Sequence, residues 1–319
     1  MVAIDSYAGG DGRLSPLSTP SATRAVLEAH GIGTKYTLGQ NFLVNDDVLK
    51  KIIALAEVGE NDRVLEVGPG IGTLTIALLK HAASVIAIER DPDLPAVLAD
   101  TLHPWREKFA LIEKDALDVT RDDIVAAMVE IGGDTGYPDR ASSAANETAQ
   151  WTVSQSEDCL SESGYPVAPP QEDLQLSLPS KLVANLPYAV AATVVLDYFE
   201  SFPFLDSATI MVQKEVADRM AAAVGTKNYG AYTVKLGLYA EPVGRFAVGP
   251  GNFFPPPRVD SAVIRLNRRV PLRADGAPAS PEVIAAAASW PTPPSPTAAR
   301  PSPTPARPTS PAAARSCWA

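Results

Sequence analysis

The fold of this chain is decided by one stretch of sequence, RVLEVGPGIGT, at residues 63–73. Its first five residues form a short β-branched run that predicts a strand, and residues 73–80 predict a helix. Gly68, Gly70 and Gly72 lie in the turn between them. Glycines at such a turn let the backbone approach a ligand closely, and the N–H groups of the helix then face its polar groups. The sequence therefore predicts a cofactor site at this turn.

Four further runs on the C-terminal side of this turn predict more strands. They lie at residues 84–89, 111–113, 181–185 and 208–212. Strands that alternate with helices indicate a parallel sheet with helices on both faces. The sequence therefore predicts an α/β protein with a Rossmann-like sheet. On the N-terminal side, Asn45 is placed to cap a helix.

Two acidic residues follow the second and third predicted strands. Glu89 lies 21 residues after Gly68, where a carboxylate can accept hydrogen bonds from both ribose hydroxyls of a nucleoside. The alternative is a tight turn with an incidental surface glutamate. Asp115 is placed either to accept a hydrogen bond from a cofactor adenine amine or to cap the next helix. The turn alone does not distinguish NAD from S-adenosylmethionine, although Thr73, in place of the third glycine of the dinucleotide pattern, disfavours NAD.

The run NLPY, at residues 185–188, directly follows the fourth predicted strand. Adenine N6 is a poor nucleophile because its lone pair is delocalised into the ring. The Asn185 side-chain oxygen and the Leu186 carbonyl can accept its two hydrogens and localise that pair. Pro187 fixes the backbone so that this carbonyl points inward, and Tyr188 offers a face for an extruded base. An ordinary strand-to-turn step closed by proline is the alternative, but the position behind a glycine turn favours catalysis.

A second unusual run, FFPPPRVDS, covers residues 253–261. Its prolines stiffen a loop that can present Phe253 as the opposite face of a base sandwich. The alternative is a rigid hairpin connection with Phe253 in the core. Arg258 either contacts phosphate or is solvated.

Composition restricts partners and compartment. The net charge is −10, but residues 121–180 carry 11 acidic and 2 basic residues, so the charge neither supports nor excludes RNA. No run approaches the roughly 20 apolar residues of a membrane span, and the first residues lack a secretory signal pattern. We therefore expect a cytoplasmic protein. Cys159, Cys317 and the three histidines do not cluster, so no metal site is expected.

Three segments fall outside the predicted fold. Residues 1–20 are expected to form a disordered tail. Residues 131–178 are polar and acidic, and such a stretch cannot bury enough apolar surface to order itself, so we expect a disordered insertion. Residues 271–319 hold 12 prolines in 49 positions, which is typical of a low-complexity tail. The catalytic domain is expected at residues 21–266.

Together, these motifs resemble the ribosomal RNA adenine dimethyltransferase family, which dimethylates two adjacent adenosines near the 3′ end of small-subunit (16S) rRNA. The resemblance covers about residues 35–266. It rests on LGQNFL at 38–43, EVGPGIG at 66–72, Glu89, DAL at 115–117, NLPY at 185–188, QKEVADR at 213–219, Tyr229-Gly230 and FFPPPRVDS at 253–261.

The resemblance implies a class I S-adenosylmethionine-dependent methyltransferase fold, with a seven-stranded, mostly parallel sheet whose last hairpin is antiparallel. It implies that the cofactor contacts are Asn41, Leu43, Gly68, Gly70, Glu89, Asp115 and Asn185. The catalytic residues are then Asn185, Leu186, Pro187, Tyr188 and Phe253. The implied partner is small-subunit rRNA or its 30S precursor, bound by a monomer without a metal.

Two departures from the family pattern stand out. The acidic insertion is longer than the family usually carries. Past Leu266, the family normally continues into a small helical domain with a basic stretch that helps to hold rRNA. Here residues 280–287 resemble its first helix, and Pro/Ala-rich sequence follows. We interpret residues 267–319 as a remnant of that domain, replaced after a reading-frame change near residue 287.

The departures leave alternatives open. One is a small-subunit assembly factor that binds pre-ribosomal RNA, with methylation weak or lost. Related macrolide-resistance methyltransferases act on large-subunit rRNA but usually carry Ile in place of Leu186. DNA adenine methyltransferases more often carry Pro at that position.

Overall fold

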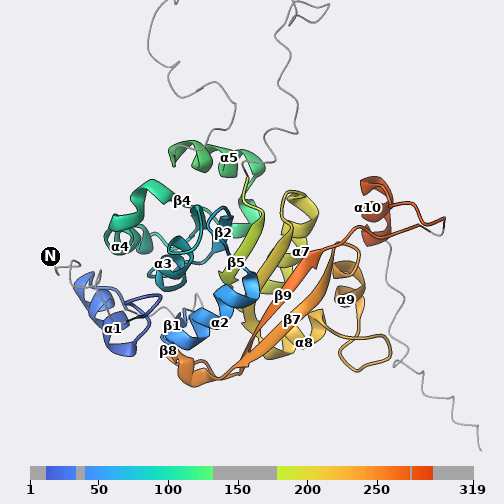
Figure 1. The fold of residues 1–319 in the computed structure, drawn as a ribbon. Coiled ribbons are helices and arrows are strands. Elements are labelled where there is room, and N and C mark those ends of the chain that lie inside the picture. Colours follow the sequence, from blue (N-terminus) through green and yellow to red (C-terminus); the bar gives the residue numbers. More distant parts are fainter. Residues whose placement is uncertain (1–11, 34–39, 132–177, 274, 290–319) are drawn as a thin grey trace, which may run out of the picture.

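A seven-stranded sheet forms the centre of the computed structural model, which describes residues 12–33, 40–131, 178–273 and 275–289 (Figure 1). In spatial order the strands are β4 (Phe109–Ile112), β3 (Ser84–Ile88), β2 (Arg63–Val67), β5 (Lys181–Asn185), β6 (Ser207–Gln213), β9 (Ser261–Arg268) and β7 (Ala240–Val248). The first five are parallel, and β9 pairs antiparallel with both β6 and β7. The expected mixed sheet with an antiparallel end is confirmed.

The strand order creates a natural crevice between β2 and β5. From β2 the chain proceeds outward through β3 to β4, then returns to β5 and proceeds the other way to β6. Helices that follow β2 and β5 therefore start on opposite sides of the sheet. In open α/β sheets, ligands bind at this reversal point, outside the carboxyl ends of the strands.

Helices cover both faces of the sheet and form two hydrophobic clusters. One face carries α1 (Pro20–Ala29), α2 (Asp46–Ala56), α3 (Thr73–Leu79) and α4 (Leu94–Thr101). The other carries α5 (Arg121–Glu130), α7 (Ala191–Ser201), α8 (Lys214–Met220), α9 (Ala231–Leu236) and α10 (Pro281–Ser289). Alternate strand residues reach opposite clusters: Val64 joins the first, and Leu65 joins the second.

A second, two-stranded sheet joins distant parts of the chain. It pairs β1 (Phe42–Leu43) with β8 (Phe253–Phe254), directly after the 3-10 helix η5 (Pro250–Asn252). Asn45 caps α2 as expected, since its side chain accepts a hydrogen bond from the Asp47 N–H at 2.9 Å. The Asn45 amide also donates to Asn252 Oδ1 at 2.8 Å, which ties the start of α2 to the β8 segment.

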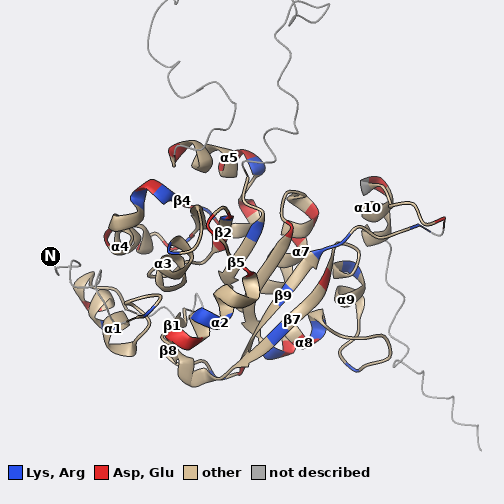
Figure 2. Cartoon of the chain, viewed as in Figure 1, with Lys and Arg blue, Asp and Glu red and all other residues tan. Residues whose placement is uncertain are grey.

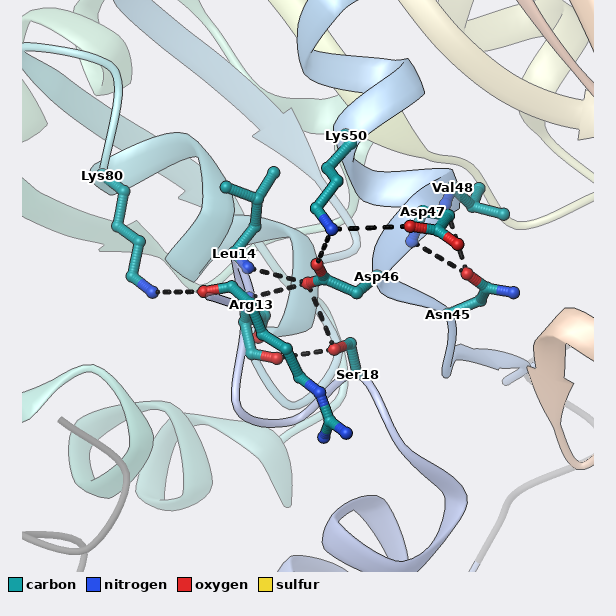
Figure 3. Close-up of polar contacts among 10 residues, drawn as sticks. Arg13, Leu14, Ser18, Asn45, Asp46, Asp47, Val48, Lys50 and Lys80 are labelled. Carbon is teal, nitrogen blue, oxygen red and sulfur yellow. Dashed lines mark hydrogen bonds and ion pairs between the residues drawn. The ribbon is translucent and has the colours of Figure 1, made fainter. Parts of the chain in front are cut away.

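The expectation of a disordered tail over residues 1–20 is wrong for its described part. Leu17 and Ser18 are buried, and the backbone N–H groups of Leu14 and Ser15 donate to Asp46 Oδ1 at 2.8 and 3.2 Å (Figure 3). Lys80 Nζ also binds a carbonyl oxygen of this segment, that of Arg13, at 3.0 Å. The Gly, Ser and Pro composition did not reveal these long-range contacts. Residues 1–11 lie outside the described residues.

Two other expected disordered segments also lie largely outside the described residues. The chain leaves the described part after Ile131, at the end of α5, and returns at Leu178, just before the amino end of β5 (Figure 1). Leu178 is buried in the core. Leu178, which precedes β5, therefore lies at the end of the sheet opposite to the strand ends that line the crevice. Residues 290–319 are not described, and no helix in the described ranges is both long and apolar enough to cross a membrane.

Replacing Asp46 should release the N-terminal segment from α2. We expect Asp46→Ala to lower the free energy of unfolding by about 1–3 kcal/mol near pH 7, because several charge-assisted hydrogen bonds are lost. Burial raises the pKa of Asp46, but hydrogen bonds from Lys50, Ser15 and Leu14 outweigh it and lower the pKa below 3.8. The stabilisation is therefore present above about pH 4 and is lost as the pH falls through the folded pKa.

Urea unfolding at pH 7 and pH 3 measures this difference. Asp47→Ala is the matched control, since Asp47 shares the first turn of α2 but its side chain is 81% exposed. Equal losses in the two variants would contradict the proposed role of Asp46.

Candidate active site

A cavity of about 490 Å³ opens at the carboxyl ends of β2, β3 and β5. Its volume lies within the range of about 300–1,000 Å³ that is usual for ligand pockets. The sequence-predicted residues that line it are Asn41, Leu43, Gly68, Gly70, Glu89, Asp115, Asn185, Leu186, Pro187 and Tyr188. The structure thus brings together ten of the eleven residues expected from sequence, although their roles stay predictions.

The glycine turn follows a path that other residues adopt poorly. Gly68 has φ +69° and Gly70 has φ +60°, both in the left-handed region. A Cβ atom on Gly70 would lie 3.1 Å from Cε1 of Phe42, so the turn and the β1 segment approach one another closely. This close approach forms one wall of the cavity.

The three residues that follow β3, Glu89 to Asp91, hold the cavity wall beside the glycine turn through hydrogen bonds. Glu89 is 8% exposed, and its Oε1 accepts hydrogen bonds from the backbone N–H groups of Arg90 and Asp91 at 3.0 and 2.9 Å. Burial raises the pKa of Glu89, although the backbone N–H groups counter it. Asp91 in turn accepts a hydrogen bond from Gln40 Nε2 at 2.7 Å. The carboxylate of Glu89 is therefore held at the cavity wall by its own loop.

Asn185 lies at the tip of β5 and faces the segment Gln40–Leu43. Its Nδ2 donates to the carbonyl oxygen of Asn41 at 3.2 Å. This bond orients the amide so that the nitrogen points to Asn41 and the oxygen points elsewhere. An acceptor role for the Asn185 oxygen is therefore compatible with the geometry.

The rest of the NLPY run is fixed by neighbouring strands. The Leu186 N–H donates to the carbonyl of Met211 at 3.1 Å, which extends the pairing of β5 with β6. The hydroxyl of Tyr188 lies 2.6 Å from Oγ of Ser261, at the start of β9. Burial raises the pKa of Tyr188, so the phenol stays neutral. The Tyr188 ring is therefore anchored at the cavity.

Phe253 does not lie where the base-sandwich prediction placed it. Its side chain is 4% exposed, belongs to the hydrophobic cluster of α1–α4, and does not line the cavity. Strand pairing explains this, because Phe253 lies opposite Leu43 in the β1–β8 sheet. The FFPPPRVDS run contributes to the cavity only indirectly, through the hydrogen bond of Ser261 to Tyr188. The core alternative for Phe253 is therefore the one that the structure supports.

Asp115 has two partners, and both sequence alternatives for it fit the geometry. Its Oδ1 accepts the Leu117 N–H at 3.1 Å and caps the 3-10 helix η4 (Ala116–Asp118). Its Oδ2 accepts from Arg90 Nη1 at 2.8 Å. A carboxylate offers about four acceptor positions, so capacity for a ligand amine is left.

The sequence analysis did not single out Glu66, which lines the cavity from within β2. Its side chain is 1% exposed, and its buried Oε2 has no hydrogen-bond partner among the described residues. Burial and the nearby Glu89 together raise the pKa of Glu66 to about 8, although Thr75 partly counters them. The signal in the sequence was an ionisable residue between the apolar Leu65 and Val67 of this strand, directly before the glycine turn.

Comparison with known proteins places this fold in a defined class. The structure resembles a dimethyladenosine transferase from Plasmodium falciparum, with a TM-score of 0.50 and 24% sequence identity, over 72% of this chain and 63% of that chain. The strand order, the antiparallel end and the glycine turn after β2 define the class I methyltransferase fold. The expected fold class is confirmed.

The family follows from the sequence comparisons. The model of the family "Ribosomal RNA adenine dimethylase" matches residues 33–276, and the chain belongs to this family. It is 35% identical over 252 residues to "Ribosomal RNA small subunit methyltransferase A" of Corynebacterium jeikeium, covering 78% of this chain and 65% of the relative. The protein of the same name from Ligilactobacillus salivarius is also 35% identical, with 80% and 71% covered. The chain thus spans about two thirds of the length of these relatives.

The buried carboxyl of Glu66 should leave a signature in the pH dependence of stability. Since the folded pKa of about 8 lies above the ordinary glutamate value of 4.5, the unfolded chain loses this proton first as the pH rises. The free energy of unfolding should therefore fall between about pH 4.5 and pH 8, by about 1.4 kcal/mol per pH unit, and level off above. We expect Glu66→Gln to remove this slope.

Urea unfolding of the ligand-free protein from pH 5 to pH 9 measures the slope. Glu60→Gln, on the exposed loop before β2, is the control. Parallel curves for the wild type and Glu66→Gln would show that the carboxyl titrates normally.

Proposed function

We propose that this protein transfers methyl groups from S-adenosylmethionine to the N6 amines of two adjacent adenosines in a hairpin loop of small-subunit rRNA. The observation that carries the proposal is the amide of Asn185, held at the tip of β5 by the Asn41 carbonyl with its oxygen left to accept a substrate amine. The family and the names of the relatives support the substrate.

The cavity fits the proposed cofactor in charge and shape. Glu89 presents a buried carboxylate of the kind that binds ribose hydroxyls, and Asp115, on the loop after β4, lines the same cavity. Gly68 and Gly70 let the turn pack closely against Pro187 and Phe42 at the cavity. Oε2 of Glu66, which has no hydrogen-bond partner among the described residues, offers a further acceptor. When bound, S-adenosylmethionine supplies an electrophilic methyl group on a cationic sulfur.

The chain's own residues act on the substrate amine. The Asn185 side-chain oxygen and the Leu186 carbonyl accept the two N6 hydrogens, which draws the nitrogen lone pair out of conjugation with the ring. Pro187 and the Leu186–Met211 hydrogen bond keep that carbonyl in place. The ring of Tyr188, anchored by Ser261, provides a stacking face for the base. The surplus proton leaves after transfer, because the methylated nitrogen is a stronger acid than the neutral amine.

Unpaired loop adenosines suit this geometry, because a base must leave its stack to reach Asn185. We also infer a cytoplasmic, monomeric enzyme, as expected from the sequence. The alternative of an assembly factor without methylation is not favoured, because it gives no reason for the orientation of Asn185. Transfer of labelled methyl groups to unmethylated small subunits, followed by mapping of the modified bases, tests the proposal.

Asn185→Ala should abolish methyl transfer. We expect turnover to fall by at least a hundredfold, because the variant loses the acceptor that polarises the amine, whereas cofactor binding stays measurable. Labelled-methyl transfer and calorimetric binding of S-adenosylhomocysteine measure the two effects. Asn267→Ala, on β9 and outside the cavity, is the control. Substantial turnover in Asn185→Ala would contradict the assigned role.

Glu89→Ala should weaken cofactor binding. The loss of charged hydrogen bonds to the ribose is expected to cost about 1–3 kcal/mol, or roughly 5-fold to 150-fold in the dissociation constant. Isothermal titration with S-adenosylhomocysteine measures it. Glu107→Ala, in the exposed 3-10 helix η3 (His103–Lys108), is the control. An unchanged dissociation constant would remove Glu89 from the cofactor site.

A further inference from the structure

Gln213 is a cavity residue to which the proposed chemistry gives no role. It begins the QKEVADR run, at residues 213–219, on which the family resemblance partly rests. It ends β6 after six buried residues, and its half-buried side chain lines the cavity. Gln213 is also the N-cap residue of α8, yet its side chain makes no capping hydrogen bond. The helix that follows therefore does not account for a carboxamide at this position.

Strand pairing places Gln213 beside Asn185. In the parallel pair of β5 and β6, Asn185 lies opposite Met211, two residues before Gln213. Alternate residues of a strand point to the same face of the sheet, so Gln213 shares the face of Met211. Val183 and Met211 both belong to the hydrophobic cluster of α1–α4. The carboxamides of Asn185 and Gln213 thus lie on one face, at the ends of neighbouring strands.

The next strand brings Gln213 close to Tyr188 as well. Gln213 lies directly opposite Ser261 in the antiparallel pair of β6 and β9. The Cβ atoms of such a pair are about 4.5–5.5 Å apart, and both side chains share a face. Oγ of Ser261 in turn lies 2.6 Å from the hydroxyl of Tyr188. Gln213 therefore flanks the ring that is proposed to stack on the substrate base.

The charged groups next to Gln213 are paired with one another, away from the cavity. Lys214 Nζ binds Asp218 at 2.7 Å, and Arg245 of β7 binds the same carboxylate at 2.9 Å (Figure 2). None of these three residues lines the cavity within the described part of the chain. The polar group that β6 offers to a ligand is therefore a neutral carboxamide, which binds by hydrogen bonding and not by charge.

The proposed contacts to the substrate leave one motion of the base free. The two acceptors at Asn185 and Leu186 hold only the amine, and a stacked ring can still turn in its own plane on Tyr188. Methyl transfer depends on alignment, because the nitrogen lone pair must point at the methyl group. Adenine has unprotonated ring nitrogens on both sides of its amine, N1 and N7, and a carboxamide is well suited to bind an adenine edge.

We propose that Gln213 positions the target adenine by donating a hydrogen bond from Nε2 to a ring nitrogen beside the amine, N1 or N7. This inference rests on the proposed function. The contact fixes the rotation of the base on Tyr188 and so directs the N6 lone pair. A glutamate of the same shape offers only acceptors when ionised, so it cannot replace the glutamine.

Methyl transfer to small subunits whose target adenosines are replaced by 1-deazaadenosine or 7-deazaadenosine tests the proposal. For the wild type, kcat/KM should fall by about 3-fold to 30-fold more on the analogue that lacks the accepting nitrogen than on the other. Gln213→Met keeps the side-chain length but has no donor. It should lose a similar factor on natural subunits and no longer distinguish the two analogues beyond their intrinsic reactivity, because the two changes remove the same bond.

Gln213→Glu provides a second variant of unchanged volume, with the same expected loss on natural subunits. Both variants should keep the urea midpoint of the wild type and its affinity for S-adenosylhomocysteine within about twofold, since α8 has no side-chain cap to lose. Asn267→Ala is the matched control. It removes a carboxamide from β9 opposite Ser207, at the other end of β6, and should keep wild-type kcat/KM on all three substrates.

The outcomes separate this inference from the proposed function. Wild-type kcat/KM in Gln213→Met, or the same difference between the analogues in this variant and the wild type, would overturn the role of Gln213 while methylation by the wild type stands. An equal loss in Asn267→Ala would overturn it too. Absence of methyl transfer from the wild type to natural subunits would overturn the proposed function and this inference with it.

Discussion

The close approach of the β2–α3 turn to the β1 segment is the constraint on which the cavity depends. Phe42 lies so near to Gly70 that a Cβ atom on this glycine would come within 3.1 Å of its ring, which is tighter than an ordinary van der Waals contact. Gly70 also has a positive φ, which glycine adopts without a steric penalty. The turn can therefore pass under the β1 segment and still leave room for a ligand beside it. The packing of α3 and the opening towards β5 both follow from this path.

The residues after β3 extend that arrangement across the cavity. Glu89 accepts hydrogen bonds from its own loop, Arg90 reaches the loop after β4, and Asp91 holds Gln40 of the segment before β1. These three consecutive residues thus tie the loop after β3 to the loop after β4 and to the segment before β1. Since successive residues beyond a strand end point in different directions, a short loop can hold separate parts of the site in register.

Electrostatics in the cavity favour a cationic ligand. Glu66 and Glu89 are both buried, and burial raises the pKa of each. Their mutual repulsion adds to this effect for Glu66. A positively charged group in the cavity would favour the ionised carboxylates, because opposite charges in a region of low dielectric attract strongly. The proposed cofactor, with its cationic sulfur, meets this condition.

The sequence by itself determined the strands around the glycine turn, since alternating apolar residues and glycines act locally. The strand predicted at residues 63–67 has the same bounds as β2 of the structure. Motif order also identified the family and ten of the cavity residues. Only the tertiary structure decided the positions of Phe253 and of residues 14–18. Phe253 entered the core because β8 pairs with β1, and residues 14–18 became ordered because Asp46 binds them. Such contacts join residues far apart in the chain, so no local pattern encodes them.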